Sequence, residues 1–173
     1  MTRTTNARIA GFTFLFYIVV GITSLAISAR AGARDVLSVL MSLSALVLGV
    51  TLYALTRDED QDLALLALTC RVIEAVPSPE SGAIFFAVGS TLFSWLFLRG
   101  RMIPIALAWF GVVASIVLAA ILVLQRAGLF AVATNWFSSA TWLVWFPMLI
   151  FEVTLALWLI VKGVATPRRS SRQ

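Results

Sequence analysis

The sequence predicts an all-α, polytopic integral membrane protein in which six transmembrane helices form one bundle. Hydrophobic residues make up 61% of the chain and charged residues only 12%, and the mean hydropathy is +0.99. These values lie outside the range of soluble domains. Because one span takes roughly twenty residues, the 173 residues hold about six spans and no separate soluble domain. We therefore expect residues 1–173 to form a single membrane domain.

The apolar segments are expected to be helices, because a lone strand in hydrocarbon leaves its backbone groups unpaired. The first segment follows Arg3 and Arg8 and ends in an Ala-Arg-Ala sequence that resembles a signal-peptide cleavage site, but its apolar run is too long for a signal peptide.

The third and fourth segments are short, so one span broken by Pro77 and Pro79 is an alternative. The turn-forming residues around these prolines favour two helices. The six helices are expected at residues 9–28, 36–55, 63–76, 83–98, 103–124 and 140–161.

The distribution of basic residues predicts the orientation in the membrane. The net charge of +5 comes from residues near helix ends and in the C-terminal tail, which indicates positive-inside topology rather than nucleic-acid binding. Nine basic residues lie on one side and three on the other, so we expect a bacterial-type cytoplasmic (inner) membrane with both termini in the cytoplasm. The cytoplasmic set is Arg3, Arg8, Arg57, Arg99, Arg101, Lys162, Arg168, Arg169 and Arg172, and the opposite set is Arg30, Arg34 and Arg126.

The composition also limits the kinds of metal, haem and disulfide site that the protein can form. Histidine is absent and Cys70 is the single cysteine, so zinc, haem and intrachain disulfide sites lack their usual ligands or partners. We expect no metal and no cofactor. The acidic loop at 58–62 is interpreted as a solvated hairpin in which Asp60 or Asp62 caps the third helix, with a metal or partner site as the alternative.

Three ionisable residues lie at bilayer depth, where a charge costs about 2.5–3.5 kcal/mol on insertion scales and therefore usually faces the bundle interior. Arg71 and Glu74 are three residues apart, on one face of the third helix. Glu152 lies near the middle of the sixth helix, at a height that allows Arg71 to reach it. These residues are our candidate ligand- or proton-binding site.

Several neighbouring residues can support this site. Pro147, five residues before Glu152, is expected to bend the sixth helix and to free a backbone carbonyl, and broken helices build polar pockets in this way in transporters. The Tyr17 hydroxyl either donates to the charged residues or only fills space. Further hydroxyls are available from Ser90, Ser94, Thr69 and Thr154.

Four stretches resemble a bacterial multipass membrane family, domain of unknown function 4386. They are RIAGFTFLFYIVVGI, DLALLALTCRVIEA, FLRGRMIPIALAWFGV and FEVTLALWLIVKG. The resemblance implies a six-helix membrane fold and implies no activity. The connection at residues 29–35 is shorter than is usual in the family, which argues against a function in a long outer loop. The resemblance places eight residues of this chain on positions that match the pattern of the family: Arg8, Gly11, Arg71, Glu74, Pro104, Glu152, Lys162 and Gly163.

Two functional hypotheses follow from the intramembrane charges. In the leading one the protein is a small transporter or a ligand-binding membrane protein, where Arg71 attracts an anionic group or keeps the acids ionised and Glu152 changes its protonation. In the alternative the charges only fix helix register in a non-catalytic accessory or assembly subunit. A lipid-modifying enzyme ranks third, because no nucleophile–base pair accompanies the acids. The expected partners are the lipid bilayer, a small-molecule or ion ligand, and another membrane protein or a second copy of the chain.

Overall fold

A computed structural model of the chain describes residues 2–26, 31–76, 82–129 and 139–165. Within these ranges all regular structure is helical, which confirms the predicted all-α membrane bundle. The six helices are α1 (Arg3–Ala26), α2 (Ala31–Thr56), α3 (Gln61–Ala75), α4 (Gly82–Arg99), α5 (Ile105–Arg126) and α6 (Ser139–Val161).

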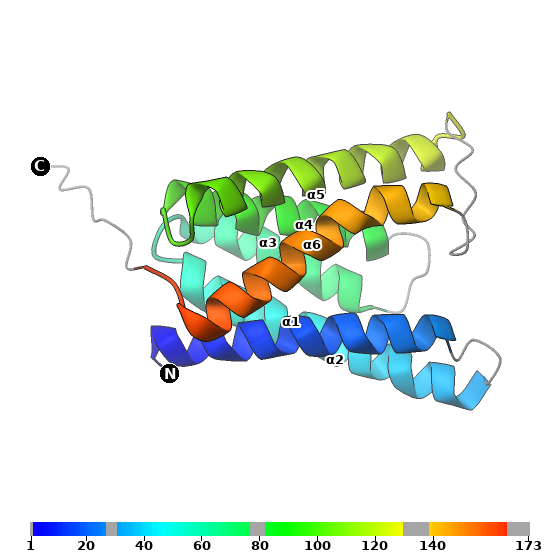
Figure 1. The fold of residues 1–173 in the computed structure, drawn as a ribbon, viewed down its shortest axis with the longest axis horizontal. Coiled ribbons are helices and arrows are strands. Elements are labelled where there is room, and N and C mark those ends of the chain that lie inside the picture. Colours follow the sequence, from blue (N-terminus) through cyan, green and yellow to red (C-terminus); the bar gives the residue numbers. More distant parts are fainter. Residues whose placement is uncertain (1, 27–30, 77–81, 130–138, 166–173) are drawn as a thin grey trace, which may run out of the picture.

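Consecutive helices run antiparallel, so the start of α1 and the end of α6 lie at the same end of the bundle (Figure 1). Each helix packs against the next one in the sequence, and α6 returns to pack against α1. The short helix α3 lies between α2 and α4, which also contact each other. The bundle is therefore a closed ring of helices.

The helix boundaries differ from the sequence prediction mainly at the ends. Helix α1 begins at Arg3, before the apolar run, because a helix can continue through polar residues into the interfacial region of a bilayer. Two separate helices are found where a single broken span was the alternative, since α3 ends at Ala75 and α4 begins at Gly82. The capping residue Val76 is extended, with φ −73° and ψ 127°, as expected for a residue that precedes a proline.

The predicted cap of the third helix is confirmed. The Asp60 carboxylate accepts a hydrogen bond from the backbone N–H of Leu63 at 3.1 Å. The same carboxylate pairs with Arg99 at 3.0 Å, and Asp58 pairs with Arg3 at 3.4 Å. These pairs are solvent-exposed and each contributes little stability, but they join the ends of α1 and α4 to the acidic loop.

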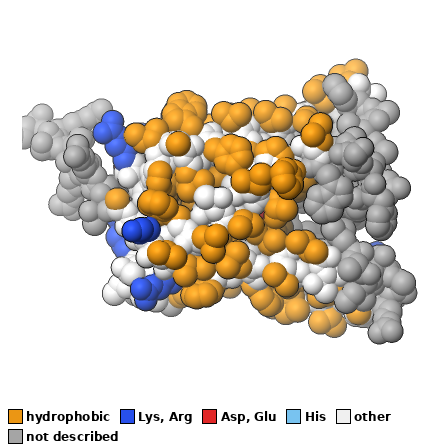
Figure 2. Space-filling model, in the orientation of Figure 1, with side chains coloured by type: hydrophobic (Ala, Val, Ile, Leu, Met, Phe, Trp, Pro, Cys, Tyr) orange, Lys and Arg blue, Asp and Glu red, His pale blue; other side chains and the backbone are white. Residues whose placement is uncertain are grey.

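Five of the helices, all except α3, are long and apolar enough to cross a membrane. Helix α3 has 15 residues and is about 22 Å long at 1.5 Å per residue. It is therefore shorter than the hydrocarbon core of a bilayer, which is about 30 Å thick. Hydrophobic side chains cover the middle of the visible surface, and Lys and Arg side chains lie at the end where the chain begins (Figure 2). The protein is thus a multi-pass membrane protein.

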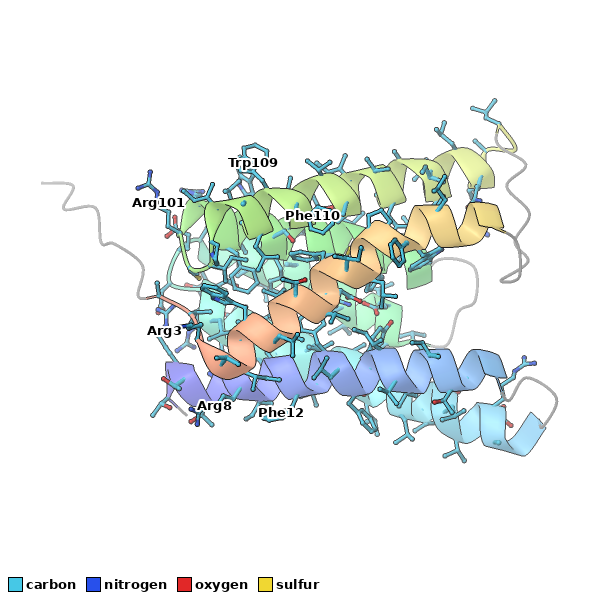
Figure 3. All side chains as sticks on the ribbon, viewed as in Figure 1. Arg3, Arg8, Phe12, Arg101, Trp109 and Phe110 are labelled. Carbon is cyan, nitrogen blue, oxygen red and sulfur yellow. The ribbon has the colours of Figure 1, made fainter. Side chains whose placement is uncertain are left out.

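The outward-facing side chains fit this description. Phe12 on α1 and Trp109 on α5 are half or more exposed and project away from the bundle (Figure 3). Arg3, Arg8 and Arg101 lie together at the end of the bundle that holds the N-terminus (Figure 3). An apolar belt with basic residues at its border is the surface that a bilayer requires.

Helices α1 and α6 approach each other closely near the basic end. A Cβ atom added to Gly11 would lie 2.6 Å from Cγ1 of Ile160 and 2.7 Å from the backbone oxygen of Ala156, so only glycine fits. From this crossing α6 runs diagonally away from α1 and toward α5 (Figure 1). The two helices therefore diverge in the half of the bundle that lies away from the termini.

We predict that Gly11→Ala lowers the free energy of unfolding by about 1–3 kcal/mol, the usual range for overpacking, because the Ala156 backbone cannot move aside as a side chain can. Gly32→Ala is the matched control, since a Cβ at Gly32 meets nothing within 4 Å and alanine favours helix. Unfolding in mixed micelles with increasing denaturing detergent measures both variants. Equal stability of the two variants would contradict the close packing of α1 on α6.

Candidate ligand-binding site

Arg71 lies at the centre of the bundle and is only 1% exposed. Glycines on both neighbouring helices make room for α3 at this level. A Cβ on Gly49 of α2 would lie 2.9 Å from the Arg71 Cβ, and a Cβ on Gly89 of α4 would lie 3.1 Å from the Cys70 Cβ. Small residues at contacts allow helices in membranes to pack closely. They let α2 and α4 enclose the guanidinium group.

The Arg71 guanidinium is bound by its own helix and by α4. Nη1 donates to Glu74 Oε2 at 2.8 Å and Nη2 donates to Ser90 Oγ at 3.1 Å. The group also lies over the ring of Phe86, with Cζ 4.9 Å from the ring centroid, a favourable cation–π distance. The predicted contact of Arg71 with a bundle carboxylate is therefore formed with Glu74.

Glu74 completes this cluster. Its Oε1 accepts a hydrogen bond from the Tyr17 hydroxyl of α1 at 2.9 Å, while Oε2 is bound to Arg71. Of the two roles considered for Tyr17, donation to the charged residues is the observed one. Both carboxylate oxygens are thus satisfied, as a buried ion pair requires if its desolvation is to be offset.

Glu152 is buried too, at 5% exposure, but it lies outside this bonded cluster. It forms no ion pair with any described residue, and its Oε1 has no hydrogen-bond partner among them. Arg71 and Glu152 do share the wall of a small cavity of about 10 Å³. Arg71 pairs with Glu74 instead, because Glu74 is on the same helical face and needs no reach across the bundle.

A much larger cavity, of about 440 Å³, lies on the other side of Glu152. We call it the Glu152 cavity. It occupies the half of the bundle where α1 and α6 diverge, and its walls come from α1, α2, α4, α6 and the end of α3. Both carboxylates line it, together with the aromatic rings of Tyr17, Phe86 and Trp145. None of the described residues that line it is Lys or Arg.

The remaining candidate residues differ in their relation to the site. Ser90 accepts from Arg71, and Ser94 is buried on the wall of the small cavity, so both belong to the site. Pro147 lies inside α6, which continues through it as one helix from Ser139 to Val161. Thr69 and Thr154 are exposed and donate to carbonyls of their own helices, so they lie outside the site.

Sequence reasoning missed the aromatic wall of the Glu152 cavity. The helical spacing contained a signal, because Phe86 precedes Ser90 by four residues, and Met148 and Trp145 precede Glu152 by four and seven. Residues at these spacings share one face of a helix. In a chain so rich in apolar residues, the same spacing also occurs on faces that meet lipid.

Six antiparallel helices with an apolar exterior and a buried polar cluster define a polytopic α-helical membrane protein. Residues 80–163 match the sequence model of a family described as "Domain of unknown function (DUF4386)". The match spans α4 to α6 and includes Glu152, and over these residues it confirms the resemblance to domain of unknown function 4386. The two quoted stretches in α1 and α3 lie outside the match. None of the curated proteins and none of the solved structures matches the chain.

We predict that Arg71 and Glu74 are energetically coupled. Arg71→Ala alone leaves a buried carboxylate without its partner and is expected to cost about 3–5 kcal/mol, whereas Arg71→Ala with Glu74→Gln costs less than the sum of the single changes, by about 0.5–3 kcal/mol. The same cycle with Glu152→Gln is the comparison and should give a smaller coupling. Equilibrium unfolding of the single and double variants measures both. Coupling to Glu152 as large as that to Glu74 would contradict the observed pairing.

Proposed function

We propose that the protein binds a small solute in the Glu152 cavity and carries it across the membrane. The observation that supports this is the buried carboxylate of Glu152, which lies on the wall of a cavity of about 440 Å³ and has one oxygen without a hydrogen-bond partner among the described residues. Ligand sites commonly have volumes of about 300–1,000 Å³, with apolar walls and a few polar groups. An ionisable residue in a membrane interior is a usual mark of such a site.

In this proposal Arg71 is a positioning residue. Both of its terminal nitrogens are engaged, one by Glu74 and one by Ser90, and it does not line the Glu152 cavity. Two roles were considered for Arg71. Attraction of an anionic ligand agrees poorly with these contacts, because both terminal nitrogens are already bound, whereas interaction with an acidic side chain agrees with the ion pair to Glu74. This leaves Glu152 as the carboxylate that meets the solute or a proton.

The packing supports closure of the cavity on the side where the chain begins. On the side toward the termini the path from Glu152 is filled by apolar side chains, among them Phe14, Phe93 and Phe97, and by the close contact of α1 with α6 at Gly11. Transporters alternate access by moving helices around a central site. Separation of α6 from α1 at this contact would open the second side.

A role in assembly alone explains the buried charges less well than solute binding does. Charges that only fix helix register should be fully paired, because an unpaired buried charge destabilises the fold. Arg71 and Glu74 meet that description. Glu152 does not, since it has no ionic partner among the described residues, so a role in solute binding accounts for it better.

We expect the protein to be stabilised by solutes that enter the cavity, and Glu152→Gln to abolish this while leaving the fold intact, because the amide keeps the shape and can still form hydrogen bonds. At 100 times its Kd a solute adds about 2.7 kcal/mol. Thermal unfolding of purified protein against a panel of cationic, neutral and anionic solutes measures the effect. Glu59→Gln is the control, since Glu59 lies in the exposed loop at the opposite end and pairs with Arg99.

An absence of stabilisation by any solute class would remove the support for ligand binding. So would equal stabilisation of the wild type and Glu152→Gln. If Glu152→Gln failed to fold, Glu152 would be a structural residue and the assembly role would take precedence.

The basic residues also support an orientation in a bacterial-type cytoplasmic membrane. Arg30, Arg168, Arg169 and Arg172 lie outside the described residues. Of the described ones, Arg34 and Arg126 lie at the end of the bundle away from the termini. The end that holds the start of α1 and the end of α6 carries Arg3, Arg8, Arg57, Arg99, Arg101 and Lys162, which is the excess expected of a cytoplasmic side.

We therefore predict that both termini are cytoplasmic and that the α3–α4 connection is external. A reporter that is active in only one compartment, fused at Gln173 or inserted near Glu80, should give opposite signals at the two positions. Equal signals would contradict the six-helix topology, and an external C-terminus would contradict the orientation.

A further inference from the structure

We propose that the ligand of the Glu152 cavity is a hydrophobic organic monocation, and that it exchanges with a proton at Glu152. This inference rests on the proposed solute-binding function and names its substrate class. Three features support it: the balance of buried charge, the composition of the cavity wall and the size of the cavity.

Among the described residues the buried charges do not balance. Arg71 and Glu74 neutralise each other through a 2.8 Å ion pair. Glu152 then has no counter-charge among the described residues, and an uncompensated carboxylate in a low-dielectric interior is costly. One positive charge restores neutrality. Either a proton on Glu152 or a monocation beside it supplies that charge.

The wall of the cavity suits a cation with an apolar body. Tyr17 stacks on Phe86, with ring centroids 6.4 Å apart, and Phe86 meets Trp145 at 5.9 Å, so the three rings form one aromatic surface next to both carboxylates. Aromatic faces attract cations, Trp most strongly. An anion would face two carboxylates, and none of the described residues on the wall is basic.

The size of the cavity excludes a bare metal ion as the main occupant. A volume of about 440 Å³ is that of an organic ligand site. Hard cations such as Ca²⁺ need about six to eight oxygen ligands, whereas this wall is mostly apolar. An aliphatic or aromatic ammonium or phosphonium ion satisfies both the charge and the wall.

The cation and a proton would bind the same carboxylate, that of Glu152, and so they exchange with each other. Among the described residues that line the two cavities around Glu152, the other titratable groups are Tyr17 on α1 and Arg71 and Glu74 on α3, while α2, α4 and α5 contribute none. The three form their own bonded cluster. A cation that binds beside Glu152 therefore displaces one proton, and its affinity should rise with pH until Glu152 is fully ionised.

The test uses the full-length protein in nanodiscs of zwitterionic lipid, with empty nanodiscs subtracted. Three probes are compared by equilibrium dialysis: tetraphenylphosphonium, its negatively charged counterpart of similar shape tetraphenylborate, and neutral triphenylphosphine oxide. We expect saturable binding of tetraphenylphosphonium at least tenfold tighter than that of the other two. Glu152→Gln should weaken it at least tenfold and Glu59→Gln should leave it unchanged. In the wild type, the affinity should increase by up to tenfold per pH unit, and in Glu152→Gln it should not change with pH.

Tighter binding of tetraphenylborate or triphenylphosphine oxide, with the loss in Glu152→Gln retained, would overturn the cation assignment and leave the proposed solute-binding function standing. Binding of none of the three probes, together with no stabilisation by any class in the solute panel, would overturn both. Equal binding of tetraphenylphosphonium by Glu152→Gln overturns the inference. If that variant does not fold, the pH dependence in the wild type decides, and a flat profile overturns the inference.

Discussion

A guanidinium group at the depth of Arg71 has to be enclosed by protein, because hydrocarbon offers it no hydrogen-bond partner. The arrangement of the helices follows from this requirement. Helix α3 is short and lies between α2 and α4, and glycines at 49 and 89 remove the side chains that would keep these helices apart. Glu74, Ser90 and the Phe86 ring then occupy three sides of the guanidinium. Because both terminal nitrogens of Arg71 are engaged in this way, Glu152 has no ionic partner among the described residues.

The crossing of α1 and α6 determines where the cavity lies. The two helices touch at Gly11, near the basic end, and diverge from there. The divergence leaves a space next to Glu152 in the opposite half of the bundle, and Tyr17, Phe86 and Trp145 line it. A single close contact at one end therefore combines with a charged cluster in the middle to form a pocket beside Glu152. Neither feature alone would bring a free carboxylate to a cavity wall.

The sequence was sufficient to predict the helices, since long apolar runs have no other stable structure in lipid. The three-residue spacing also places Arg71 and Glu74 on one face of α3, which makes their contact possible. The sequence could not decide whether Arg71 pairs with Glu74 or with Glu152, since that depends on the rotation of α6 about its axis. For the same reason it could not separate Ser90, which is in the site, from Thr69 and Thr154, which face outward. Apolar residues give no amphipathic contrast when lipid and core are equally hydrophobic.

The closed ring of helices has a consequence for biogenesis. Helices enter the membrane in order during synthesis, so the surface of α1 that packs on α6 faces lipid until the last helix has been made. The Arg71 charge is paired before that stage, because Glu74 lies on the same helix and Ser90 lies on the next helix to be made. Glu152 arrives last, in the helix that closes the ring. A nascent chain therefore inserts its arginine as part of a neutral pair, and only complete assembly encloses the remaining carboxylate.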